Sequence, residues 1–563
     1  MRVHSLLACV GLILPATVSA QMSAPAPGRD SLAPVPAGAA RVEQTTPGAR
    51  PPATLVASFD GLGQGFVGPH GSATGRNPSD NSLAVGPDHI VQIVNSRMAI
   101  FTKKGRRFAE TGRAVYGPVG TNNVFRGFGG PCEARPNGDA VVRYDQLADR
   151  WLIVMPLFSR APLRDHEPTP GRAGEPAQRS EIGHPGQPGA AVALFQPPPA
   201  APAVASAPDQ RTGPRTRPPA EKGSYGMCYA ISTGPDPFGP YYRYYFVRPL
   251  FPDYPRPAVW PDGYYLPTST GDDVVQKQDC VVDRRKMLRG EPASEQCIVV
   301  DGVNFLNNVD LDGRQLPPAG APNIVLAAGG TQLEKKMEDD GIYAWTFHVD
   351  WNDTSRTVLT GPVKIPVAPY HYLCDGQLTN CVPQPGTDRR LDAQGDKLMA
   401  RVVYRRLGRQ ESIVAAHSVN SSAGGGGVRW YELRLDAHRM PVLHQQGTYA
   451  PDSLYRWMPS PAMDGKGNIG IGYSFGGTPD FAGQRFAGRL ADDPLGQLTL
   501  HESVLVEGEA AQTNTMRWED YAQTAVDPSD DCTIWYVGDY LKRDATNYST
   551  RIGAFRMPGC RGK

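Results

Sequence analysis

The chain has 563 residues, and its 57 Lys and Arg residues almost balance its 56 Asp and Glu residues. This balance argues against a nucleic-acid partner, because phosphate binding needs a clustered positive field, and it also argues against a polybasic membrane anchor. A glycan or a protein partner stays open. Gly and Pro are abundant and long helix-period patterns are absent, which favours an all-β fold of short strands joined by turns.

The N-terminus has the three parts of a signal peptide. Arg2 gives a short positive region, an apolar run follows at 6–14, and Val18-Ser19-Ala20 is a small-residue cleavage site. We therefore predict a signal peptide over 1–20 and a secreted or periplasmic mature protein. No later stretch is long and apolar enough to cross a membrane.

Two low-complexity tracts interrupt the chain. Residues 21–52 are rich in Pro, Ala and Gly, and we predict a disordered linker there. A second Pro-rich tract at about 160–222 separates two strand patterns. We interpret it as a disordered loop insertion, with an interaction arm as the alternative. The remainder, 53–563, is predicted to be one domain.

Within that domain one strand pattern recurs seven times, which is the sequence mark of a repeat architecture. The copies lie at 83–88, 140–145, 258–262, 323–327, 400–404, 462–466 and 525–529. Two copies agree in finer detail, since Asp253-Tyr254 and Asp520-Tyr521 each stand three residues before an Ala-Val pair. The unit has the size of four antiparallel strands with their loops, as in one propeller blade.

A second strand pattern follows each copy of the first. Its copies lie at 98–101, 228–231, 280–283, 342–347, 429–433, 485–489 and 551–555, and we assign it as the third strand of each unit. The last unit then lacks a fourth strand, and the strand pattern at 54–59 is available to supply it. The sequence thus predicts a seven-bladed β-propeller closed by an N-terminal strand. The alternative is a pair of β-sandwich domains.

Cysteine usage fits an exported protein. One of the nine cysteines, Cys9, leaves with the signal peptide, and an even number remains, which indicates a disulfide framework. Proximity in the chain suggests three pairs, although the sequence alone does not fix them: Cys280 with Cys297, Cys374 with Cys381, and Cys532 with Cys560. Cys132 and Cys228 are then left to pair with each other. A zinc site is not expected, because no CxxC pair exists and histidines are few.

Acidic residues precede the first strand of several units, at the positions Asp80, Asp139, Asp253, Asp396 and Asp520. In a propeller such residues could form a ring of carboxylates at one mouth of the central channel. Oxygen ligands suit Ca²⁺, and two carboxylates at a suitable separation serve glycoside hydrolysis. We name Asp139, Asp253 and Asp520 as catalytic candidates. The alternative is that each Asp only stabilises a turn by bonding its own backbone.

Two aromatic–arginine pairs are candidate ligand-binding residues. Arg456-Trp457 and Arg517-Trp518 precede the first strands of the last two units. Trp stacks on sugar rings and Arg holds carboxylates in two-point contacts, so the set would suit an acidic polysaccharide. The alternative is packing between blades.

Three stretches carry a resemblance to a known group. They are 455–469, 517–536 and 551–560, with the sequences Tyr455-Arg456-Trp457, Arg517-Trp518-Glu519-Asp520-Tyr521 and Arg551-Ile552-Gly553-Ala554-Phe555 among them. Here the chain resembles secreted bacterial β-propeller proteins without assigned function. The resemblance implies export and a propeller but no catalytic residue. The architecture is also similar to sialidases, but the Ser-x-Asp-x-Gly-x-Thr-Trp box and a convincing arginine triad are missing.

These patterns leave two classes of function. The first is a secreted propeller, expected to be monomeric, that binds a glycan or a protein and needs no cofactor, with Ca²⁺ as the one ion considered. The alternative is a polysaccharide-active glycoside hydrolase or lyase with its site at one mouth of the channel. The two differ in whether the named Asp and Arg side chains converge in space.

Overall fold

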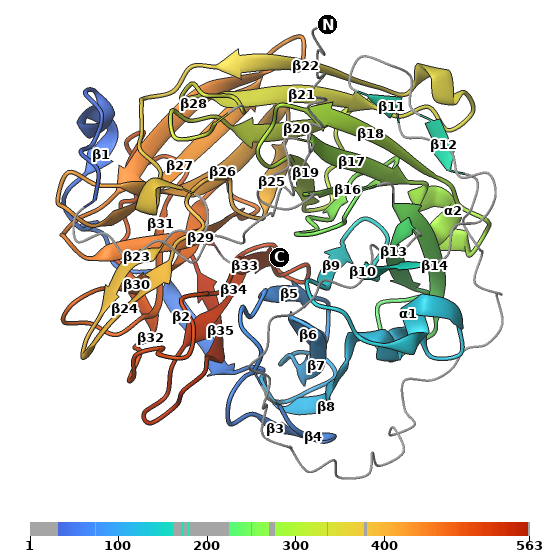
Figure 1. Cartoon of the computed structure of the whole chain (residues 1–563), viewed down its shortest axis with the longest axis horizontal. Helices are drawn as coiled ribbons and strands as arrows, with labels where there is room; N and C mark the ends of the chain where they lie inside the picture. The colour runs from blue at the N-terminus through green and yellow to red at the C-terminus, as the bar shows by residue number, and fades with distance from the viewer. Residues whose placement is uncertain are drawn as a thin grey trace, which may run out of the picture.

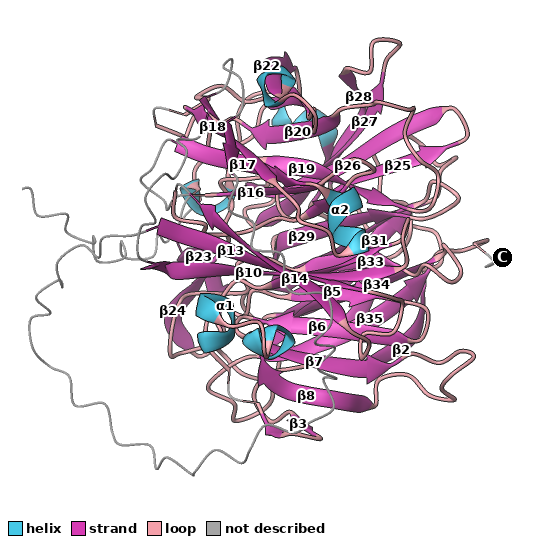
Figure 2. Ribbon diagram, turned by 90° about the vertical axis from the view of Figure 1, so that its right-hand side faces the viewer, coloured by secondary structure: helices cyan, strands magenta, loops and turns pink. Residues whose placement is uncertain are grey.

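The computed structural model describes residues 32–73, 75–161, 171–172, 178–180, 224–248, 250–269, 276–334, 336–376 and 380–560. Within these residues the protein is all-β, with many small sheets and a few short helices. Figure 1 shows the sheets arranged around a common centre, and Figure 2 shows the strands running across the molecule from one face to the other. No helix in the described part is both long and apolar enough to span a bilayer. The predicted signal peptide lies outside the described residues.

Groups of four antiparallel strands follow one another along the chain. The first group is β5 (Ser82–Val85), β6 (His89–Val94), β7 (Arg97–Thr102) and β8 (Ala114–Gly120). The second is β9 (Val141–Asp145), β10 (Arg150–Ala161), β13 (Ser224–Ser232) and β14 (Tyr241–Arg248). The third is β15 (Ala258–Val259), β16 (Tyr264–Thr268), β17 (Gln276–Val282) and β18 (Glu295–Asp301).

The next groups continue the same order. The fourth is β19 (Asn307–Asp312), β20 (Asn323–Ala328), β21 (Ile342–His348) and β22 (Val358–Ile365). The fifth is β25 (Val402–Leu407), β26 (Gln410–Asn420), β27 (Gly426–Leu435) and β28 (Pro441–Tyr449). These two groups join into one nine-stranded sheet, because β19 and β25 pair in parallel and β1 (Glu43–Gln44) adds to β28.

The last groups bring the two ends of the chain together. The sixth is β29 (Tyr455–Met463), β30 (Ile469–Gly476), β31 (Gly483–Arg489) and β32 (Ser503–Val506). The seventh is β33 (Gln523–Val526), β34 (Thr533–Tyr540), β35 (Ser549–Arg556) and β2 (Thr54–Asp60). The N-terminal strand therefore pairs with β35 as the sequence predicts, and Figure 1 shows the blue β2 beside the red β35.

The first strands of the groups contact one another in chain order, and β33 contacts β5. Apolar clusters fill the space between neighbouring sheets. Leu83 and Val85 of β5, for example, share one cluster with Trp535 and Val537 of β34. Inner strands are consequently buried on both faces, as in β6, and only outer strands such as β22 are widely exposed. Packing face to face removes the alternation that a half-exposed strand would show.

The predicted strand positions agree with the structure, with one exception. The copies of the second pattern all fall on third strands, from β7 to β35. The copies of the first pattern fall on first strands except 323–327, which is β20, the second strand of its group. The true first strand, β19, reads Asn-Asn-Val-Asp-Leu-Asp, and its Asp310 and Asp312 form buried ion pairs. Because β19 is polar, the repeated apolar pattern could not be recognised there.

Part of the segment predicted as a linker is ordered. From Leu32 onwards it packs on the fifth and sixth groups through the 3₁₀ turn η1 (Ala39–Val42), strand β1 and a hydrogen bond from Gln44 to the carbonyl of Leu498, 3.0 Å long. Within the Pro-rich insertion, β11 (Gly171–Arg172) and β12 (Gln178–Ser180) pair with β18. The rest of the insertion lies outside the described residues.

The remaining elements are short. They are the strand pairs β3 (Val67–Gly68) with β4 (Gly71–Ser72) and β23 (Asn380–Gln384) with β24 (Thr387–Asp392), the helices α1 (Gly130–Ala134) and α2 (Arg284–Arg289), and the 3₁₀ turns η2 (Thr121–Phe125), η3 (Thr354–Arg356) and η4 (Leu373–Asp375).

The structure forms all four expected disulfides. Two close short loops, with sequence separations of 7 residues for Cys374–Cys381 and 17 for Cys280–Cys297. Cys532–Cys560 spans 28 residues and ties the seventh sheet to the chain end, and Cys132–Cys228 spans 96 residues. Such a framework is typical of proteins that fold in an oxidising compartment.

Removing the bond with the longest loop should cost the most stability. Loop-closure entropy predicts that the Cys132→Ser/Cys228→Ser variant loses about 4 to 5 kcal/mol of unfolding free energy, and the Cys374→Ser/Cys381→Ser variant about 2 kcal/mol. Denaturant unfolding of both variants beside the parent protein measures this order. Equal losses, or a larger loss for the short loop, would contradict it.

Candidate functional site

The segments that precede the first strands meet at one face of the molecule, and we call the cluster they form the carboxylate mouth. It contains Asp80, Asp139, Asp253 and Asp520, which come from the first, second, third and seventh groups. The backbone N–H of Asp80 donates to the carbonyl of Glu519 at 2.7 Å, which joins the first group to the seventh. Four of the five predicted acidic residues are thus brought together.

The repeated Asp-Tyr pairs hold the mouth together. The Tyr254 hydroxyl donates to the carbonyl of Asp520 at 2.6 Å, and the Tyr254 N–H donates to a carboxylate oxygen of Asp139 at 3.2 Å. The rings of Tyr254 and Tyr521 pack edge to face, with centroids 5.0 Å apart. The two tyrosines were visible in the sequence as a repeated dipeptide, although their structural role was not predicted.

A left-handed backbone recurs at this position. Asp80, Asp139, Tyr254 and Asp520 have φ angles of 50°, 57°, 52° and 69°. Asp adopts this conformation more readily than most residues, because its short side chain bonds locally. This preference accounts for Asp80, Asp139 and Asp520, whereas in the third group the left-handed residue is Tyr254 and Asp253 precedes it.

The carboxylates repel one another. Burial raises the pKa of Asp80 well above its ordinary value, and the charges of Asp139 and Asp520 raise it further, against the lowering effect of Arg517. Burial also raises the pKa of Asp139, with Asp253 and Asp520 adding to it, and the Asp139 and Asp253 carboxyl groups are hydrogen-bonded to each other. Two carboxyl groups can share a hydrogen bond only when one of them carries a proton.

The four acidic side chains differ in exposure. Asp80 is 1% exposed and Asp520 is 8% exposed, whereas Asp139 and Asp253 are partly open to solvent. Two polar atoms facing the cluster, Asp80 Oδ1 and the Tyr521 hydroxyl, have no hydrogen-bond partner among the described residues, although both residues are almost fully buried. Unpaired buried polar atoms are costly, so this is a position where a ligand would gain contacts.

Arg517 balances part of the negative charge. Its guanidinium forms ion pairs with Asp520 and, at 3.3 Å, with Asp392, and its side chain is 32% exposed. Gln394 donates to Asp520 at 3.2 Å. Burial raises the pKa of Asp392 to about 7, against the lowering effect of Arg517. Asp392 is the last residue of β24 and Gln394 lies just after it, and neither belongs to a repeated pattern, so sequence analysis could not single them out.

Asp396, the fifth predicted acidic residue, has a different role. It is fully buried, and Lys397 donates to its carboxylate at 2.6 Å. The Lys397 ammonium also lies 4.4 Å from the ring centroid of Phe305. Asp396 therefore belongs to an internal ion pair beneath the mouth.

The centre of the molecule below the mouth is closed by another ion-pair network. Arg143 lies 3.2 Å from Asp310, Arg401 lies 2.8 Å from the same carboxylate, and Arg401 also pairs with Asp312. Their side chains are at most 5% exposed. Only about 20 Å³ of free space remains between the first strands at the level of this network.

The two Arg-Trp pairs lie mainly inside the protein. Trp457 and Trp518 are fully buried, with ring centroids 6.2 Å apart, so neither ring offers a face to a ligand in this structure. Arg456 is also buried and pairs with Asp452 and with Glu502, each at 2.8 Å. Of the four residues, Arg517 alone reaches the carboxylate mouth.

Comparison with known proteins gives only distant similarities. No family model and no curated protein matches the chain. The chain is similar to the crystal structure of a protein of unknown function from Dyadobacter fermentans, with a TM-score of 0.34 and 9% identity over 90% of this chain and 100% of that one. It is also similar to an ulvan lyase of polysaccharide lyase family PL25, with a TM-score of 0.36 and 10% identity over 88% and 95% of the two chains. At this level no residue role is transferred.

A buried carboxyl group near the mouth should make stability depend on pH. Burial raises the pKa of Asp279 to about 8, and Arg248 and Arg256 offset only part of the effect. The folded state keeps the proton to a higher pH than the unfolded state, so stability falls as pH rises from about 4 towards 8. Asp279→Asn should remove up to about 1.4 kcal/mol per pH unit of this slope.

Denaturant unfolding at several pH values between these limits measures the slope. Asp388→Asn, which removes an exposed carboxylate, is the matched control and should leave the slope unchanged. Parallel pH profiles for the parent protein and Asp279→Asn would overturn this assignment.

Proposed function

We propose that the seven strand groups are the blades of a seven-bladed β-propeller, and that the protein is an exported binding protein with its ligand site at the carboxylate mouth. The cyclic contacts of the first strands and the completion of the seventh group by β2 support the propeller. The disulfides and the predicted signal peptide support export.

The ligand we propose for the mouth is a divalent cation, Ca²⁺ in the first instance. No three of its carboxylates offer oxygen atoms within 4.8 Å of one another in this structure, so the cation would have to draw them together. The observation that carries this proposal is the convergence of Asp80, Asp139, Asp253 and Asp520 from four separate groups. Carboxylate oxygens are the ligands Ca²⁺ prefers, and a cation would neutralise charges that otherwise repel one another. The unpartnered Asp80 Oδ1 and Tyr521 hydroxyl add oxygen atoms on the same side.

The exposed part of the mouth is where a larger ligand would be held. Asp139, Asp253 and Arg517 are each partly open to solvent. Ca²⁺ sites commonly keep water ligands, and a hydroxyl or carboxylate of a glycan or a protein replaces such waters in this proposal. Arg517, already paired with Asp520, would supply a second contact to an acidic group.

A second candidate is a polysaccharide hydrolase that uses the same residues. The cluster favours it because burial raises the pKa of Asp139, and glycoside hydrolysis pairs a carboxylic acid of raised pKa with a second carboxylate. Asp520, which comes from a different group, would be the second carboxylate, because the two groups must flank the scissile bond and cannot bond to each other. The binding protein is expected to bind calcium and to release no sugar product. The hydrolase is expected to release new reducing ends.

Calorimetric titration of the chelator-treated mature protein with CaCl₂ tests the cation site. We expect binding of one Ca²⁺ and a higher melting temperature, since a ligand at a hundredfold excess over its Kd adds about 2.7 kcal/mol of stability. Asp139→Asn and Asp520→Asn should weaken binding by roughly tenfold or more, because each removes a charged ligand. Asp492→Asn, at an exposed position, should bind as the parent does.

Absence of both heat and stabilisation with millimolar calcium would overturn the cation proposal. A reducing-end assay on neutral and acidic polysaccharides, with calcium and with chelator, tests the hydrolase. New reducing ends that disappear in Asp139→Asn would replace the binding proposal by the enzyme.

A further inference from the structure

A cavity lies at the other end of the first strands, opposite the carboxylate mouth. Hairpins that join first to second strands in the second, fourth, fifth, sixth and seventh groups line it, and it has a volume of about 450 Å³. Arg314, Arg405, Arg406 and Asp531 are among its lining residues. The size is that of a small-ligand site, and we call it the arginine cavity.

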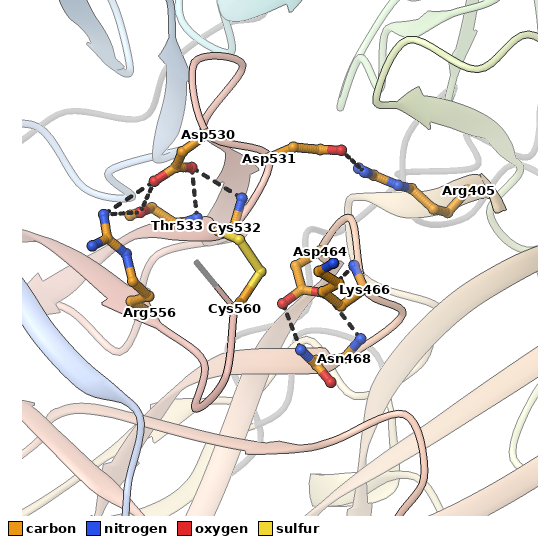
Figure 3. Close-up of a disulfide and its surroundings, with 10 residues drawn as sticks. All are labelled: Arg405, Asp464, Lys466, Asn468, Asp530, Asp531, Cys532, Thr533, Arg556 and Cys560. Atoms are coloured by element: carbon orange, nitrogen blue, oxygen red, sulfur yellow. Dashed lines mark hydrogen bonds and ion pairs between the residues drawn. A yellow bond between two sulfur atoms is a disulfide. The ribbon is translucent and has the colours of Figure 1, made fainter. Parts of the chain in front are cut away.

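Arg405 is the central charged group of this cavity. Its side chain is 2% exposed, and one of its terminal nitrogens pairs with the carboxylate of Asp531, as Figure 3 shows. The other, Nη1, is buried and has no hydrogen-bond partner in the described residues. Gly313 makes room for the guanidinium, since a Cβ at that position would lie 2.9 Å from Arg405 Cζ. A buried guanidinium with an unused N–H donor is poised for an anion.

The rim adds positive charge. Arg314 is 54% exposed and pairs with Asp149 at 2.7 Å, and Arg406 donates to the carbonyl of Leu316 at 2.7 Å. Against these three arginines the cavity lining has the two carboxylates of Asp530 and Asp531. Asp530 is occupied elsewhere, because it accepts hydrogen bonds from its own hairpin and pairs with Arg556. Arg314 and Arg405 are themselves paired with Asp149 and Asp531, so the excess positive charge comes from Arg406, which forms no ion pair among the described residues. This excess favours negative ligands.

The walls of the cavity are held in place before any ligand binds. The Cys532–Cys560 disulfide anchors the hairpin that carries Asp531, and Asp530 accepts the N–H groups of Cys532 and Thr533, each at 2.9 Å (Figure 3). The N–H of Gly465, in the neighbouring hairpin, donates to the carbonyl of Asp531 at 2.7 Å. A preorganised wall loses little entropy on binding.

The arginine cavity is separate from the carboxylate mouth. The ion pairs of Arg143 and Arg401 with Asp310 lie between them and leave almost no free space. A ligand cannot pass from one end to the other through this network as it stands. The carboxylate mouth and the arginine cavity are therefore two distinct places in the fold.

We propose that the arginine cavity is an anion-binding site that takes the carboxylate or sulfate group of a sugar-sized ligand. Arg405 Nη1 donates the central hydrogen bond, and Arg314 and Arg406 hold the charge at the rim. Guanidinium groups match the planar oxygens of a carboxylate and also donate to the oxygens of a sulfate. The same chemistry fits a free anion and an acidic unit of a polysaccharide, and the test separates these sources.

Calorimetry of the mature, oxidised protein with sodium sulfate, glucuronic acid, a chondroitin sulfate tetrasaccharide and neutral maltotetraose tests the proposal. We expect binding of charged probes only, and weaker binding as ionic strength rises. The tetrasaccharide binding more tightly than either small anion identifies an acidic glycan as the source. If sodium sulfate binds as tightly as the tetrasaccharide, the ligand is a free anion. Either result supports the site.

Variants locate the binding to this cavity. Arg405→Gln and Arg314→Gln should each weaken it by roughly tenfold, the value of a charged hydrogen bond. Arg405→Gln removes the pair with Asp531 and could disturb the hairpin. Arg314 is exposed, so Arg314→Gln should fold in either case. Arg409→Gln, at the exposed tip of the hairpin that carries Arg405, is the matched control. No binding of any charged probe, equal binding of maltotetraose, or parental affinity in both test variants would overturn the proposal.

Discussion

The pairing of β2 with β35 is the constraint on which the rest of the structure depends. A strand from the start of the chain completes the sheet made by its end, in a register that joins Thr54 to Arg556 and Asp60 to Arg551. Without β2 the seventh sheet would have three strands, and β35, which is largely buried, would become its edge strand. The same closure sets the first sheet against the seventh, where the Asp80 N–H donates to the Glu519 carbonyl.

Closure also explains why residues far apart in the chain make one site. Asp80 and Asp520 come from opposite ends of the domain, yet the charge of Asp520 adds to the effect of burial in raising the pKa of Asp80. The ends of the first strands carry opposite functions in our account, with carboxylates at one face and Arg405 at the other, separated by the Arg401 network.

The sequence predicted those parts of the structure that repeat. A regular unit predicts the third strands and the closing strand. It also predicts the convergence of Asp139 with Asp253, because equivalent positions of neighbouring groups meet.

Sequence analysis did not predict the features that lie outside the repeat. β19 was overlooked because its Asp310 is buried as an ion pair, and Trp457 was placed near a ligand although it packs inside the protein. The arginine cavity was not predicted, because its residues sit at different positions of their hairpins.

Comparison of two truncated proteins tests the closure of the ring most directly. One begins after residue 52 and keeps β2, and the other begins after residue 60 and lacks it. The account predicts that the first unfolds cooperatively and binds calcium at the carboxylate mouth, whereas the second loses both properties because Asp80 and Asp520 are no longer held together. Equal melting temperature and equal calcium affinity in the two proteins would contradict it.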